Sequence, residues 1–219
     1  MTCYLCGATD PETRDHVPPK GFFPEPRPGN LITVPCCHRC NNGFSKDDDA
    51  VRAWFSMSLG HSPDADWIVQ NKLFASTFTR SKAFCRQIRD SMVDALIHDE
   101  DGQPMRVVRY DMDRERTERF IIRTTKGLLK HYFPDYDSSQ DQWFAHFLGS
   151  EVAELAKYET LRDKLPCFDR RGDRVVSYWF GFLAGGKTGV WLIMFYESVI
   201  FMVTHSSSPT LFEGIETYA

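Results

Sequence analysis

The stretch CCHRCNN, residues 36–42, carries the second of two Cys-x-x-Cys pairs near the start of the chain. The first pair is Cys3 and Cys6, and the second is Cys37 and Cys40. Each short loop lets two thiolates meet one ion, so two such loops suit a tetrahedral four-thiolate zinc site. The spacing therefore predicts a structural Zn²⁺ on these four cysteines. The alternative is that they are buried thiols or a redox pair.

The residues around these pairs favour a segment that a metal stabilises. Seven prolines lie before Cys36, and proline is not tolerated inside a helix, so this segment cannot be one long helix. It also has few large apolar groups to form a core, and units of that size are often stabilised by a structural metal. Cys36 has the wrong spacing for a ligand and is expected to be a packing residue. His38 lies inside the second loop and could replace one thiolate.

The composition is that of an ordinary globular protein. The chain has 219 residues, of which 42% are hydrophobic and 26% charged, with a formal net charge of −4. This charge disfavours binding of nucleic acid over the whole surface, so a local patch or a metal would have to provide it. No secretory signal is visible, and the longest apolar run, 190–203, contains Glu197. We expect a cytoplasmic protein without a membrane partner, with its cysteines serving as ligands and buried thiols.

Periodicity divides the rest of the chain into helices and strands. Apolar spacing predicts a helix after Cys40 and further helices over about 65–97, 114–132 and 140–157. Alternation predicts strands at 105–113, 174–183, 189–196 and 198–205. The expected fold class is α+β, with an N-terminal zinc-pinned unit at 1–60. A mixed helical and antiparallel-β accessory region of unknown role, 61–219, would follow.

The segment between the cysteine pairs is expected to form a β-hairpin. The sequence TRDHV, 13–17, and the sequence NLITV, 30–34, are suited to pair with each other. A helix beginning near Cys37 would pack across them and complete a ββα unit. The hairpin carries an acid beside a base, Asp15 and His16, followed by two prolines.

In this order the motifs C-x-x-C, DHVPP, N-L and C-x-x-C-N resemble those of the HNH (ββα-metal) endonucleases, whose unit is treble-clef-like. The resemblance is narrower to the bacterial subgroup with four cysteines and covers roughly residues 1 to 55. It implies that His16 is the general base and that Asp15 binds a catalytic Mg²⁺ or Mn²⁺. It also implies that Asn41 is the second protein ligand and that Asn30 braces the loop carrying the base.

The chemistry of these side chains suits phosphodiester hydrolysis. A neutral imidazole can take a proton from water near pH 7, and oxygen ligands suit a hard divalent ion. On a regular strand Asp15 and His16 would point to opposite faces. In the family the strand is irregular at this motif, so we expect both to reach one cleft.

Several assignments have alternatives. Asn42 competes with Asn41 as the ligand, because the sequence does not fix the helix phase. Asn41 could instead cap a helix, and Asp15 could instead orient a neighbouring side chain. Lys46 and Arg39 are candidate phosphate contacts.

Three further stretches need an interpretation. The acidic run 47–49 is expected to be solvated, and it would repel phosphate. The basic stretch 106–133 could line a nucleic-acid path, but a solvated helix face with local ion pairs is the favoured interpretation. The sequence GFLAGGKT, 181–188, matches a phosphate-binding loop in letters, yet a strand-like stretch follows it where a helix is needed. We expect a hairpin turn at 185–188.

These observations support two hypotheses. The first is an HNH endonuclease that hydrolyses phosphodiester bonds in DNA, leaves a 5′-phosphate, as the resemblance implies, and nicks one strand at a time. Cutting both strands would require a homodimer or repositioning. The second is a non-catalytic zinc module that binds nucleic acid or protein, which the acidic net charge favours.

Overall fold

The computed structural model describes residues 1–58, 60–98, 101–149, 152–183, 186 and 188–207. The fold is mixed, with helices and three antiparallel sheets. The N-terminal hairpin pairs β1 (Thr13–His16) with β2 (Thr33–Cys36), so the second strand begins later than the predicted 30–34. Two helices follow directly, α1 (His38–Gly43) and α2 (Ser45–Ser56), and α1 contacts β1. The predicted order of two strands and a helix is confirmed.

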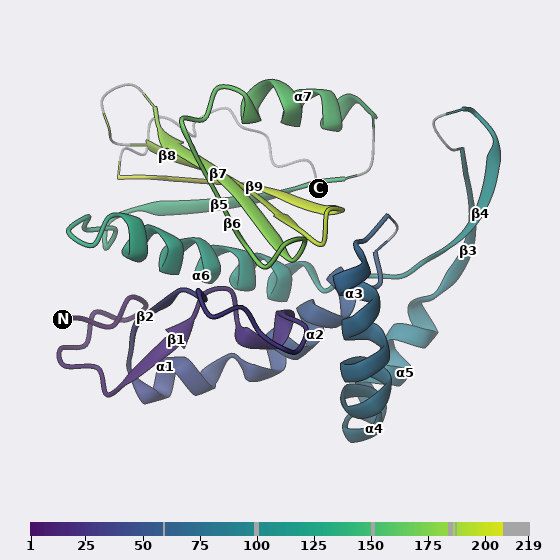
Figure 1. Cartoon of the computed structure of the whole chain (residues 1–219), viewed down its shortest axis with the longest axis horizontal. Helices are drawn as coiled ribbons and strands as arrows, with labels where there is room; N and C mark the ends of the chain where they lie inside the picture. Colours follow the sequence, from purple (N-terminus) through teal and green to yellow (C-terminus); the bar gives the residue numbers. More distant parts are fainter. Residues whose placement is uncertain (59, 99–100, 150–151, 184–185, 187, 208–219) are drawn as a thin grey trace.

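Between α2 and the central helix the chain forms a side structure. It contains α3 (Pro63–Ile68), the π-helical η2 (Val69–Thr77), α4 (Phe78–Arg80) and α5 (Lys82–Ser91), then β3 (Val93–His98) and β4 (Pro104–Arg109). β3 and β4 pair only with each other and project from the body (Figure 1). The predicted helix 65–97 is therefore wrong beyond Ser91. Val93 and Leu96 fit the helical period, but they are exposed in β3, where pairing with β4 replaces helical hydrogen bonds.

The central helix α6 (Arg114–Tyr132) lies between the hairpin unit and a five-stranded sheet (Figure 1). The sheet has the order β5-β9-β8-β7-β6, and α7 (Val152–Arg162) covers its other face. Its strands are β5 (Gln142–Leu148), β6 (Cys167–Arg171), β7 (Val176–Phe182), β8 (Thr188–Phe195) and β9 (Val199–Ser206). The predicted helix 114–132 and the three C-terminal strands are confirmed. Burial of β8 on both faces explains its nearly continuous apolar sequence.

The predicted helix 140–157 is wrong in its first half. Residues 142–148 form the edge strand β5, which pairs with β9, and the helix begins only at Val152. The apolar spacing of Trp143, Phe144 and Phe147 fits a helix, but pairing with a distant strand decides the structure. Neither the strand β6 nor its pairing with β7 was predicted.

The glycine-rich stretch joins β7 to β8 as an antiparallel connection. The amide of Leu183 donates to the carbonyl of Thr188 at 2.8 Å, and a strand follows where a phosphate-binding loop needs a helix. Residues 184, 185 and 187 of the predicted turn lie outside the described residues. Among the described residues no helix is long and apolar enough to cross a membrane.

One hydrophobic core joins the hairpin unit to the rest of the chain. The ring of Phe22, which follows the hairpin's first strand, stacks on Phe120 of α6 with centroids 5.0 Å apart, and it also contacts Phe195 of β8. The hydroxyl of Tyr196 donates to the carbonyl of Phe22 at 2.8 Å. Side chains from both sides of residue 60 therefore share one core, and α6 fixes where the hairpin lies.

Candidate functional site

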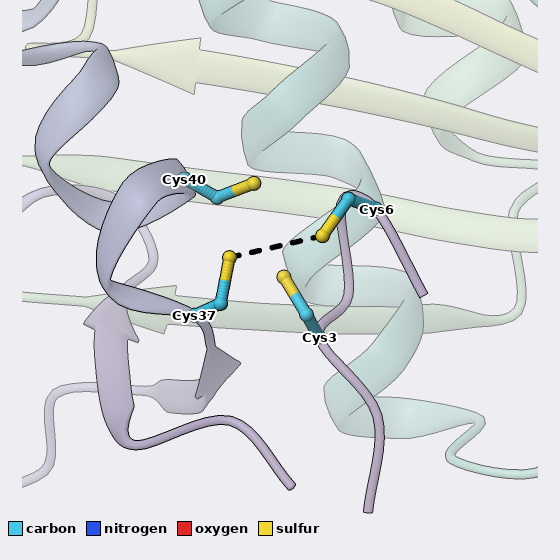
Figure 2. Close-up of side chains that lie close together, drawn as sticks. All are labelled: Cys3, Cys6, Cys37 and Cys40. Carbon is cyan, nitrogen blue, oxygen red and sulfur yellow. Dashed lines mark hydrogen bonds between the residues drawn. The ribbon is translucent and has the colours of Figure 1, made fainter. Parts of the chain in front are cut away.

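The four predicted cysteines come together at one end of the hairpin (Figure 2). The sulfurs of Cys3, Cys6, Cys37 and Cys40 all lie within 4.8 Å of one another, and those of Cys6 and Cys37 are 3.7 Å apart. The first two come from a tight N-terminal turn that Gly7 closes with a positive φ of 72°. The other two lie at the start of α1. Four thiols in this arrangement could bind a zinc ion.

The thiols at this end differ in acidity. Burial alone would raise the pKa of Cys3, but backbone hydrogen bonds from Cys37, Cys6 and Leu5 together lower its pKa to about 6. Cys36 is fully buried, and its sulfur lies 4.0 Å from that of Cys3. Burial and the nearby Cys3 raise the pKa of Cys36, which fits the packing role predicted for it. The ring of His38 lies beside Asn42, and His38 does not belong to the sulfur cluster.

The acid and the base of the DHVPP motif lie on opposite faces of a regular strand. Asp15 pairs with Val34 on the buried face and is 7% exposed, whereas His16 pairs with Thr33 on the other face. The expected irregularity at the motif is not present, because β1 continues through His16. The expectation that both side chains reach one cleft is therefore corrected for this structure.

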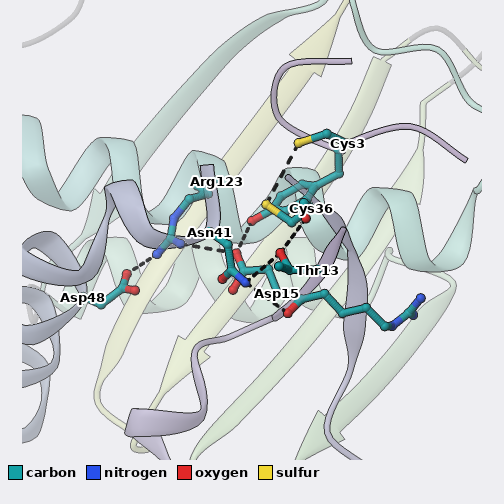
Figure 3. Close-up of polar contacts among 9 residues, drawn as sticks. Cys3, Thr13, Asp15, Cys36, Asn41, Asp48 and Arg123 are labelled. Atoms are coloured by element: carbon teal, nitrogen blue, oxygen red, sulfur yellow. Dashed lines mark hydrogen bonds and ion pairs between the residues drawn. The ribbon is translucent and has the colours of Figure 1, made fainter. Parts of the chain in front are cut away.

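Asp15 is held by two partners on the buried face (Figure 3). The hydroxyl of Tyr4 donates to Asp15 Oδ2 at 2.7 Å, and Arg123 Nη1 of α6 lies 3.5 Å from the same oxygen. Arg123 also forms an ion pair with Asp48 of α2. Burial and the charge of Asp15 raise the pKa of Tyr4, so this phenol stays a donor.

Asn41 is brought against the strand that carries Asp15. Its Nδ2 donates to Thr13 Oγ1 at 3.0 Å and to the carbonyl of Arg14 at 3.3 Å. Thr13 shares the buried face of β1 with Asp15, since residues two apart on a strand point the same way. Cys37 is the N-cap of α1, so Asn41 does not cap that helix. Asn42 is exposed and contacts His38, which leaves Asn41 as the asparagine facing β1.

Three other predicted residues are exposed. Within the part of the chain that the structure describes, no hydrogen bond joins the Asn30 side chain to a neighbour, so the loop brace predicted for it is not seen. Lys46 on α2 and Arg39 on α1 are both open to solvent, as a phosphate contact requires.

His16 has an environment that favours the neutral ring. Partial burial lowers the pKa of His16, and the charges of Lys20 and Arg27 lower it further, while Asp15 acts in the opposite direction. The imidazole is therefore deprotonated at neutral pH and can accept a proton. No hydrogen bond holds its ring among the described residues.

The acidic run of α2 is paired with arginines rather than solvated. Asp47 lies 3.3 Å from Arg116 and 3.2 Å from Arg119 of α6, and Asp49 lies 2.6 Å from Arg52. The basic stretch thus uses three of its arginines, Arg116, Arg119 and Arg123, to bind α2, a helix distant in sequence. The expected local ion pairs are present as well, since Arg116 lies 3.7 Å from Asp113 and Arg119 lies 3.7 Å from Glu115. The expectations of a wholly solvated helix face and of a solvated acidic run are corrected.

Three residues at this site were not predicted: Tyr4, Asp48 and Arg123. Burial raises the pKa of Asp48 to about 7, although Arg123 opposes this, and the neighbouring Asp15 and Asp49 contribute to the rise. The one signal in the sequence was the spacing of Arg116, Arg119 and Arg123, which places three cations on one helix face.

No family model, no curated protein and no solved structure matches the chain.

Proposed function

We propose that this protein is a metal-dependent endonuclease of the HNH type that hydrolyses phosphodiester bonds in DNA. The observation that carries the proposal is the position of Asn41, which α1 brings against β1 beside Asp15, next to a cluster of four thiols. The motif order that resembles the family also supports the proposal, whereas the opposite faces of β1 on which Asp15 and His16 lie do not. A zinc module alone needs the thiols but has no need of Asp15, His16 and Asn41.

The donor atoms suit the two metals that the resemblance implies. Four thiols fit Zn²⁺, and a site closed by four thiolates keeps no open position for chemistry, so this ion would be structural. The carboxylate of Asp15 and the amide oxygen of Asn41 are the hard donors that Mg²⁺ or Mn²⁺ prefers. A divalent ion held by them would supply positive charge to the phosphate oxygens during hydrolysis.

The residues of the chain would divide the remaining work. His16, neutral at pH 7, takes the proton of the attacking water. Lys46 and Arg39 are exposed cations near the start of α2 and on α1, and they would bind the phosphates that flank the cut bond. α6 holds the hairpin in place, because its side chains pack against β2 and the Phe22 ring.

A second candidate is the non-catalytic zinc module. It is favoured by the ion pair of Asp15 with Arg123, which occupies the carboxylate expected to bind the catalytic ion. It is also favoured by the net charge of −4.

Plasmid nicking separates the two candidates. Purified protein with zinc bound is incubated with supercoiled plasmid and Mg²⁺ or Mn²⁺, beside the variant His16→Ala. His146→Ala is the matched control, because His146 is an exposed histidine on the edge strand β5. The endonuclease predicts that wild type and His146→Ala convert plasmid to the open circle and that His16→Ala does not. The zinc module predicts no conversion by any of them.

A further inference from the structure

The guanidinium of Arg123 lies between two carboxylates from different parts of the hairpin unit. Nη1 faces Asp15 of β1 at 3.5 Å, and Nη2 pairs with Asp48 of α2 (Figure 3). The three side chains are nearly buried, with 5% of Arg123, 10% of Asp15 and 18% of Asp48 exposed. Carboxylate oxygens from β1 and α2 thus converge on one cation, the guanidinium of Arg123. This arginine belongs to α6, in the C-terminal region 61–219.

When both carboxylates are ionised, the charges of this cluster do not balance. Two carboxylates share one guanidinium, and the neighbouring arginines are engaged with other acids: Arg116 and Arg119 with Asp47, and Arg52 with Asp49. A buried charge without compensation is costly, so the pair would be better neutralised by a doubly charged ion. Aspartate oxygens on two rigid elements are also suitable ligands for such an ion.

Arg123 is not fully held where it lies. Its Nε is buried without a hydrogen-bond partner among the described residues, and its contact with Asp15 is long. Beside it is a hollow of about 410 Å³ whose wall includes Phe44 and Glu118. The guanidinium, which lies 4.9 Å from the centroid of the Phe44 ring, thus borders an open space whose wall carries the carboxylate of Glu118 and the cations Arg119 and Lys126.

We propose that Arg123 is a built-in competitor of the catalytic divalent ion, that the two exchange at the Asp15–Asp48 pair, and that Asp48 is a further ligand of the ion. This inference rests on the proposed function, in which Asp15 binds that ion. Arg123 belongs to α6, whose other face packs on the five-stranded sheet. The C-terminal region thus holds the site closed until the metal displaces its arginine.

The test measures metal binding without catalysis. Zinc-loaded wild type, Arg123→Gln and Arg123→Gln/Asp48→Asn are titrated with Mn²⁺, and the free ion is followed by its electron paramagnetic resonance signal. Thermal unfolding is recorded with and without Mn²⁺. Arg123→Gln should bind Mn²⁺ about tenfold more tightly than wild type, because a charge-assisted contact no longer has to be broken. Mn²⁺ should also raise its unfolding temperature more than that of wild type, and Asp48→Asn should abolish both gains.

The matched control is Arg119→Gln, which removes the same charge one turn away, where the partner is Asp47. Equal tightening in this variant would reduce the effect to general electrostatics and overturn the proposal. Unchanged or weaker Mn²⁺ binding by Arg123→Gln would also overturn it. If Arg123→Gln does not fold, Arg123→Lys replaces it. A lysine lacks the planar fork that lets Nη1 and Nη2 face one carboxylate each, so Mn²⁺ binding should again tighten, and no tightening contradicts the proposal.

The outcome is independent of nicking. Tighter Mn²⁺ binding without nicking of plasmid by any variant would support the competition and contradict the endonuclease. Nicking that depends on His16, with no effect of Arg123→Gln on Mn²⁺ binding, would support the endonuclease and contradict the competition.

Discussion

Gly127 of α6 lies directly against Val17, the residue that follows the acid and base of the hairpin. A Cβ atom on Gly127 would lie 2.5 Å from Val17 Cγ2 and 2.9 Å from Cγ1, closer than real atoms approach. Only glycine at this position lets the helix touch the end of β1. The contact places Arg123, one turn earlier on α6, beside Asp15.

Replacing Gly127 should therefore weaken the fold. Gly127→Ala forces the helix or Val17 to shift, which costs about 1–3 kcal/mol, and the better helix propensity of alanine offsets about 1 kcal/mol at most. Urea denaturation should show a lower free energy of unfolding, and Val17→Ala in the same background should restore part of it. Gly43→Ala in α1 is the control, because nothing lies within 4 Å of a Cβ there. Equal stability of Gly127→Ala and wild type would contradict this contact.

Loss of one thiol of the cluster should remove the zinc and destabilise the hairpin unit. Cys40→Ser leaves three thiolates, and folded structure that depends on a structural zinc site is lost with the metal. Elemental analysis should give about one zinc per chain for wild type and much less for the variant, with a lower unfolding temperature. Cys167→Ser, at an exposed cysteine in β6, should keep both values. Full zinc content in Cys40→Ser would refute a four-thiolate site.

The pH dependence of nicking should reflect the lowered pKa of His16. Because burial and Lys20 lower that pKa, the ring stays deprotonated, and active as a base, to a pH below the ordinary histidine value of 6.5. The acid limb of the rate profile should therefore lie below that value. Lys20→Met removes one charge that lowers the pKa of His16, so it should move the acid limb to higher pH. A limb above pH 6.5 in wild type would contradict the assignment.

Stability should fall with rising pH because of Asp48. The unfolded carboxyl titrates near 3.8, whereas the folded one keeps its proton up to about 7. Between these values the folded state binds the extra proton, so its contribution to stability is complete below about pH 4 and lost as pH rises through about 7. In buffer without added Mg²⁺ or Mn²⁺, Asp48→Asn should remove this part of the slope, and Asp47→Asn should not. Parallel slopes for wild type and Asp48→Asn would contradict the raised pKa.

Local signals in the sequence were sufficient for much of the fold. The two Cys-x-x-Cys pairs predict the thiol cluster because a short loop fixes the spacing of its sulfurs. Helix α6 and strands β7 to β9 are long and strongly periodic, so their type could be predicted from the apolar pattern. The hairpin was predicted from two short strands, although the observed second strand begins three residues later than the predicted one.

Other features depend on contacts between distant segments. β5 has a pattern that suits a helix, and only its pairing with β9 makes it a strand. The ion pair of Arg123 with Asp48 joins positions on different helices, and no local pattern encodes it. Arg123 also contacts Asp15, so the sequence indicated Asp15 as a candidate but not its buried partners Tyr4 and Arg123.

The most direct test of the central claim is the nicking rate of supercoiled plasmid under single-turnover conditions, with Mn²⁺ and with zinc content matched between proteins. The endonuclease predicts that His16→Ala nicks at least about a hundredfold more slowly than wild type, the usual contribution of a general base, and that His146→Ala nicks at the wild-type rate. Equal rates for wild type and His16→Ala, or no nicking by wild type, would contradict it.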